Sequence, residues 1–222
     1  MSLQTIGALG ALRLSLVVAL LFVTFTLGVS AQSIDTTPYW NGETMILSWG
    51  ALGSISYGRT IMLSPSQMIL NSFSFYLKEY SPSGSRYKAY VYEWNNSTNS
   101  VTGDALYTSN ELAAPTGNTF TKVTIDTGGI TLDASKTYVL MFSVAGVDQP
   151  PGAGYYAWGR TPPTSGGKFV WNNTNSFTNV WNYYQSWDLA FIAVFNPSAA
   201  ESVVLAGYPS ALGAANVIDA SI

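Results

Sequence analysis

The sequence predicts an all-β protein, a two-sheet antiparallel sandwich with a jelly-roll-like arrangement. Three observations lead to this class. Short segments alternate apolar and polar residues, Gly, Pro and Asn separate them, and no window of helical length repeats its apolar residues every three to four positions. Many short strands joined by such turns are typical of sandwiches and jelly rolls. We expect the sandwich to occupy residues 32–197.

The first 31 residues predict an export signal. Arg13 and the amino terminus precede an apolar run at 14–27, and small residues lead to a cleavage point after Ala31. The run is shorter than the roughly 20 residues that a membrane-spanning helix needs. We therefore expect a signal peptide at 1–31, a secreted or cell-surface protein with the periplasm as the alternative, and no membrane span in the mature chain.

The early strands are expected at 44–49, 58–63, 71–77 and 87–94. In the third of these, Phe73, Phe75 and Leu77 share one face. In the fourth, Ala89 and Val91 share a face that suits a tightly packed core. Lys88 and three aromatic residues then lie on the opposite, outer face: Tyr90, Tyr92 and Trp94.

The later strands are expected at 105–108, 120–126, 130–132, 137–144, 155–158, 168–171 and 189–195, with a tight connection at Gly128-Gly129. The segment 189–195 is apolar on both faces, which predicts a central strand. Two long connections, 147–167 and 172–186, are rich in Pro, Gly, Asn and aromatic residues. Long loops of this kind often carry binding functions. Residues 198–222 are rich in Ala, Ser and Gly, and we expect a tail or linker there.

Six segments in order carry a family resemblance: 71–77, 87–94, 103–109, 123–129, 138–142 and 188–191. Together they resemble exported bacterial β-sandwich domains of the kind found ahead of PEP-CTERM sorting signals or autotransporter barrels. The resemblance implies a β-sandwich outside the cytoplasm and supplies no catalytic residues. No Pro-Glu-Pro motif follows the domain here. We therefore expect either a fragment of a longer protein or a released or differently anchored member.

The chain contains no histidine and no cysteine. Their absence excludes Ser-His-Asp and Cys-His catalysis, and also imidazole or thiolate metal sites. The net charge is −3 and the few Lys and Arg residues do not cluster, which argues against nucleic acid as a partner. No calcium-loop motif occurs. We expect no enzymatic activity, no cofactor and no metal.

Aromatic residues are the candidate ligand-binding groups, because sugar rings stack their C–H faces on flat π-systems. Alternatively, these rings pack beneath a loop or fasten the long loops to the sheet in place of disulfides. The candidates come from the outer face of 87–94 and from the two long connections, with one carboxylate beside them: Tyr90, Tyr92, Trp94, Trp158, Trp171, Trp181, Tyr183, Trp187 and Asp188.

These observations favour a non-catalytic, exported cell-surface or extracellular-matrix protein that binds a polysaccharide. The alternative is a structural, adhesion or passenger module whose partner is a surface protein. A more remote alternative is a two-carboxylate glycoside hydrolase, which needs two acidic groups flanking one bond. Among the carboxylates, only Glu93 lies in a pattern that predicts burial.

Overall fold

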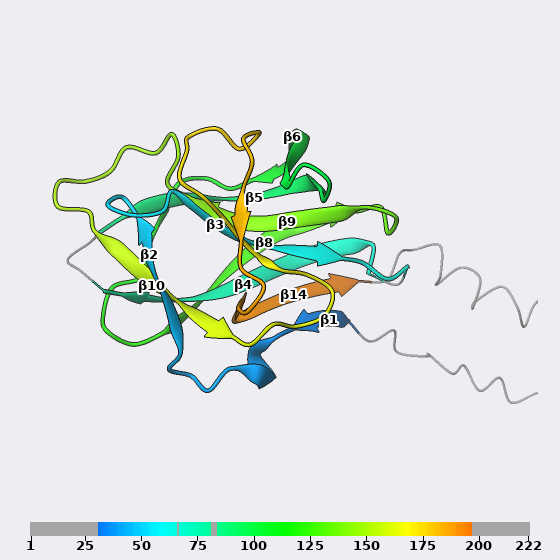
Figure 1. Cartoon of the computed structure of the whole chain (residues 1–222), viewed down its shortest axis with the longest axis horizontal. Helices are drawn as coiled ribbons and strands as arrows, with labels where there is room; N and C mark the ends of the chain where they lie inside the picture. The colour runs from blue at the N-terminus through cyan, green and yellow to red at the C-terminus, as the bar shows by residue number, and fades with distance from the viewer. Residues whose placement is uncertain (1–30, 66, 81–83, 197–222) are drawn as a thin grey trace, which may run out of the picture.

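The computed structural model describes residues 31–65, 67–80 and 84–196 and confirms the all-β prediction (Figure 1). Two sheets of seven strands each pack face to face, and every strand pairing is antiparallel. The predicted signal peptide, apart from Ala31, lies outside the described residues. The predicted tail at 198–222 also lies outside them.

The first sheet is centred on its longest strand, β4 (Ile69–Glu79). On one side, β14 and then β10 pair with successive parts of β4, and β8 pairs with its other side. The pairing of β14 with both β1 and β4 confirms a central strand over 191–195 of the predicted 189–195, whereas Leu189 belongs to the separate strand β13, which pairs with β10. The other strands of this sheet are β1 (Gln32–Asp35), β2 (Met45–Gly50), β8 (Thr121–Thr131), β10 (Tyr155–Thr161), β13 (Asp188–Leu189) and β14 (Phe191–Asn196).

The second sheet has the strand order β12-β11-β3-β9-β5-β6, with β7 paired to β5. Its strands are β3 (Ser56–Met62), β5 (Arg86–Asn95), β6 (Ser100–Thr108), β7 (Leu112–Ala113), β9 (Thr137–Ser143), β11 (Phe169–Asn172) and β12 (Asn182–Tyr183). A single 3-10 turn, η1 (Thr37–Tyr39), follows β1. Within the described ranges, no helix is long and apolar enough to cross a membrane.

The core fills the space between the sheets, and the side chains buried in it confirm the predicted alternation. Phe73, Phe75 and Leu77 of β4 are fully buried, as are Ala89 and Val91 of β5. Aromatic rings fill much of this space, and they meet mainly edge to face or tilted, the arrangements that the ring quadrupole favours. The sandwich therefore has a tightly packed aromatic interior.

The predicted connection at Gly128-Gly129 is wrong, because both glycines lie inside β8. Their φ angles of 69° and 86° lie in the left-handed region, which glycine enters without steric cost. The pairing of β8 with β4 shifts register next to them, as in a β-bulge. Thr127 stabilises the bulge by donating its hydroxyl to the carbonyl oxygen of Leu70 at 2.6 Å. A sequence signal for a turn therefore marks a bend within one continuous strand.

Candidate ligand-binding site

The outward aromatic row of β5 is present but covered. Trp94 is 4 % exposed, and the loop between β11 and β12 folds over it. Phe177 of this loop contacts the rings of Tyr90 and Tyr92, with centroids 5.1 and 5.7 Å apart, and Trp181 lies 5.9 Å from Trp94. The prediction that the row is open to ligand is therefore wrong for Tyr90 and Trp94. Tyr92 is partly buried by the same loop.

Hydrogen bonds within this loop explain why it closes over the sheet. Buried Asn172 accepts the backbone N–H of Thr174 at 2.6 Å and so starts the turn. The indole of Trp181 donates to the carbonyl of Phe177 at 2.8 Å, and its backbone N–H donates to Asn99 at 2.7 Å. Trp181 is only 2 % exposed, so the prediction that it contacts ligand is wrong. Its ring completes a second, smaller core on the outer face of the sheet.

Trp158 is fully buried in the main core, where its ring lies 5.2 Å from Trp49 and 4.7 Å from Phe75. It comes from the inward face of β10 and reaches no surface. The prediction that Trp158 binds ligand is therefore wrong as well. Its aromatic character reflects the space available between the sheets.

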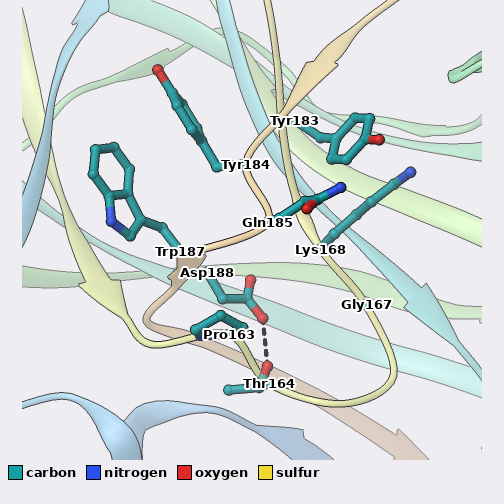
Figure 2. A pocket seen from close by; sticks show the side chains of 9 residues that line it. All are labelled: Pro163, Thr164, Gly167, Lys168, Tyr183, Tyr184, Gln185, Trp187 and Asp188. Carbon is teal, nitrogen blue, oxygen red and sulfur yellow. Dashed lines mark hydrogen bonds between the residues drawn. The ribbon is translucent and has the colours of Figure 1, made fainter.

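Besides Phe177, four aromatic residues between 171 and 187 stay in contact with solvent, and three of them gather around one hollow at the edge of the sandwich. Tyr183 and Tyr184 are 42 % and 40 % exposed, and Trp187 is partly exposed. Trp171 is also partly exposed and lies next to Tyr184. We call this the tyrosine hollow; its volume is about 190 Å³ (Figure 2), and its lining consists of Pro163, Thr164, Gly167, Lys168, Tyr183, Tyr184, Gln185, Trp187 and Asp188.

The rings of the tyrosine hollow have fixed orientations. Tyr184 lies 4.7 Å from Trp187 and 6.4 Å from Trp171, measured between ring centroids. It also stacks nearly parallel, at 11°, on Phe169, which is buried in the main core. Figure 2 shows Tyr184 and Trp187 side by side on one side of the hollow. Packing against the core edge therefore holds these rings while leaving part of their surface exposed.

Polar groups lie on the other side of the hollow, where Figure 2 shows Gln185 and Lys168 next to Tyr183. The ammonium of Lys168 lies 4.3 Å from the centroid of the Tyr183 ring, and it donates a hydrogen bond to Asn99 Oδ1 at 2.7 Å. Partial burial lowers the pKa of Lys168 from its ordinary value, because desolvation disfavours the charged form.

A buried ion pair forms the base of the hollow. Arg59, fully buried on β3, donates its Nε–H to both carboxylate oxygens of Asp188 at 3.0 Å. Thr164 donates its hydroxyl to Asp188 and accepts a hydrogen bond from Arg59 Nη2 at 2.8 Å. The backbone N–H of Leu189 also binds Asp188, at 2.8 Å. Both carboxylate oxygens thus have protein donors, and Asp188 positions the two loops instead of offering a free acceptor.

Gly167 lets the segment after Pro163 lie directly on this pair. A Cβ atom at this position would come within 1.9 Å of the carbonyl oxygen of Thr60 and 2.7 Å of Arg59 Nη1. Such distances are far below van der Waals contact, so a larger residue would force the segment away. The glycine therefore determines how closely one wall of the hollow approaches its base.

A second hollow lies next to the first and shares Trp187 with it. We call it the arginine hollow; its volume is about 260 Å³. The guanidinium carbon of Arg160 lies 4.7 Å from the centroid of the Trp187 ring, so the two side chains are in cation–π contact. The residues that line it are Thr44, Arg160, Thr161, Pro162, Ser186 and Trp187.

The carboxylates of the described residues are scattered, and few of them lie near the two hollows. Asp188 is the single carboxylate in the lining of the two hollows. The predicted burial of Glu93 is wrong: its side chain is 34 % exposed and pairs with Lys136 at 2.7 Å. The pairing of β5 with β9 keeps its register through Glu93, so Glu93 shares the face of Ala89 and Val91, but it lies near the end of β5, where its side chain reaches Lys136. Within these ranges, no group of three acidic residues could hold a metal ion.

Sequence reasoning missed several residues of the site. Arg160 and Thr164 lie within the first long connection, 147–167, and Lys168 follows it directly; no motif marks any of the three. Arg59 did carry a signal, because it is a lone charge in the otherwise uncharged strand 56–62. A charged residue in such a strand is rarely buried unless it is paired.

No family model matches the chain, and no curated protein matches it. Two solved structures match the chain weakly. One contains the cysteine protease and lectin-like domains of Cwp84, a surface layer associated protein of Clostridium difficile, at 11 % identity and TM-score 0.43; the match covers 70 % of this chain and 36 % of that one. The other is infectious bursal disease virus, Gx strain, at 12 % identity and TM-score 0.24, covering 77 % and 37 %. At such identities, function does not transfer.

Proposed function

We propose that this protein is an exported, non-catalytic β-sandwich that binds a glycan in the tyrosine hollow. The observation that carries the proposal is the gathering of Tyr183, Tyr184 and Trp187, all in contact with solvent, around one hollow with polar groups on its opposite side. A sugar ring has an apolar C–H face and a polar periphery. It therefore fits a surface that offers aromatic faces next to hydrogen-bonding groups.

The polar side of the hollow favours a sugar over a protein partner. Gln185 and Lys168 reach the hollow beside Tyr183 and can hydrogen-bond hydroxyl groups. Protein interfaces instead centre on a more continuous apolar patch with the polar groups at its rim. The rigid base also supports binding, because rings held against the core lose little freedom when a ligand arrives.

Two features support the absence of catalysis and the exported location. Glycoside hydrolysis by two carboxylates needs one acid and one base or nucleophile on either side of the bond. The hollow offers only Asp188, whose oxygens are bound by Arg59, Thr164 and Leu189. The N-terminal sequence has the charge and apolar pattern of a secretory signal.

Affinity electrophoresis against a panel of neutral, uronate-containing and sulfated polysaccharides tests the proposal. We expect retardation by at least one polymer, and we expect Tyr184→Ala and Trp187→Ala each to weaken the affinity about tenfold, or about 1.4 kcal/mol. The matched control is Tyr80→Ala, which removes a ring that is 49 % exposed and outside both hollows.

Two results would contradict the proposal. One is the absence of retardation by every polymer in the panel. The other is a Tyr80→Ala variant that loses as much affinity as Tyr184→Ala, since binding would then depend on exposed rings in general and not on this site. Circular dichroism of each variant confirms that the sandwich is intact.

A further inference from the structure

The tyrosine and arginine hollows form one extended surface, because Trp187 lines both. Tyr184 contacts one part of the Trp187 ring system, and Arg160 contacts it from the second hollow. The two hollows, of about 190 and 260 Å³, can each offer one position for a sugar ring. The side chains at both positions therefore indicate which chemical groups the ligand carries.

Each hollow contains a cation that forms no ion pair with any carboxylate of the described residues. The ion pairs formed by the described residues are Arg59–Asp188, Arg86–Glu111 and Lys136–Glu93, so neither Lys168 nor Arg160 takes part in one. Lys168 uses one hydrogen bond on Asn99 and keeps further N–H donors. The guanidinium of Arg160 rests on Trp187 and makes no hydrogen bond to another described residue.

The surroundings make these charges unusual for this protein. The chain as a whole is acidic, with 12 Asp and Glu against 9 Lys and Arg. Asp188 is the only acidic residue in the combined lining, and Arg59 neutralises it from within the core. Two uncompensated positive charges thus lie beside the exposed rings of an acidic protein.

We infer that the glycan is anionic, with carboxylate or sulfate groups that bind Arg160 and Lys168 while its rings stack on the aromatic residues. This inference rests on the proposed function. The guanidinium of Arg160, in contact with the Trp187 ring, carries N–H groups in a planar fork, and a carboxylate or sulfate can accept two of them. Lys168 supplies a second, more compact charge in the neighbouring hollow.

The test compares polymers that differ only in charge: polygalacturonate against its methyl ester, and dextran sulfate against dextran. We expect at least one charged polymer to bind about tenfold more tightly than its neutral counterpart at low salt. The preference should shrink in 0.5 M NaCl, because the Debye length falls to about 3–5 Å and exposed charges farther apart than this are largely screened. The two pairs also distinguish a carboxylate ligand from a sulfate ligand.

Four variants locate the charge effect. Arg160→Gln and Lys168→Gln should each lower the affinity for the charged polymer severalfold, and should lower the affinity for its neutral counterpart by a clearly smaller factor. Lys168→Arg, which retains the charge, should restore binding. Lys122→Gln is the matched control, since Lys122 is an exposed cation of β8 outside both hollows.

The possible failures are distinguishable. Equal binding of charged and neutral polymers, unaffected by Arg160→Gln and Lys168→Gln, would overturn the charge inference and leave the glycan site intact. A Lys122→Gln variant that weakens binding as much as Lys168→Gln would overturn it too, because the attraction would then be diffuse. If no charged or neutral polymer binds, the proposed function itself fails.

Discussion

The Arg59–Asp188 pair shows how a single buried contact can position a surface site. Both side chains are buried. A buried ion pair is stable only if its remaining donors and acceptors also have hydrogen-bond partners. Thr164, Ser165 and the backbone N–H of Leu189 provide those partners. Because Thr164 belongs to one wall of the tyrosine hollow and Asp188 to the other, the pair fixes the distance between the two walls.

Asp188→Asn should lower the free energy of unfolding by about 3–5 kcal/mol, because it leaves the buried Arg59 guanidinium without a counter-charge. Urea denaturation measures the change. Glu93→Gln breaks the solvent-exposed pair with Lys136 and should alter stability little.

A companion variant separates charge from packing at this position. Arg59→Met combined with Asp188→Leu replaces the pair by apolar side chains of similar size and should recover much of the lost stability. If Asp188→Asn unfolds at the same urea concentration as the unmodified protein, the buried pair does not have the role assigned to it.

At the level of elements, the segment that joins β11 to β13 has two parts with different roles. Its first part covers the outer face of the second sheet with Phe177 and Trp181. Its second part, from Tyr183 to Trp187, projects the exposed rings. The aromatic residues of the first part therefore pack against the sheet, whereas those of the second part face solvent.

Trp181→Ala should remove the ring that seals Trp94 and lower the free energy of unfolding by about 3 kcal/mol. Acrylamide quenching of tryptophan fluorescence should increase despite the loss of one indole, since Trp94 becomes accessible. Val180→Ala, at the neighbouring exposed position, should change neither quantity. Unchanged quenching in Trp181→Ala would show that another segment covers Trp94.

Local pattern predicted the strands and their faces well, because the side-chain period of two depends only on neighbouring residues. It correctly placed Ala89 and Val91 inward and Tyr90 and Trp94 outward. It could not show that a loop some 80 residues further along the chain covers that outer face. Trp158 illustrates the same limit, since nothing in 155–158 distinguishes an inward from an outward tryptophan.

On the scale of the whole molecule, aromatic packing and a buried ion pair anchor the long loops, a role that disulfides have in many small secreted proteins. The chain has no cysteine, yet its long loops are anchored at Asp188, Trp181 and Gly167. A sandwich of this size has enough core to be stable by itself. We propose that the ring-lined edge of this frame is a recognition surface.

The indole N–H signals in a ¹H–¹⁵N NMR spectrum test the central claim most directly. The chain has seven tryptophans, and a Trp187→Phe variant assigns the signal of Trp187. On titration with the polysaccharide fragment that binds best, the Trp187 signal should shift while those of the buried Trp49 and Trp158 stay in place. A Trp187 signal that does not move at saturating glycan would contradict binding at this site.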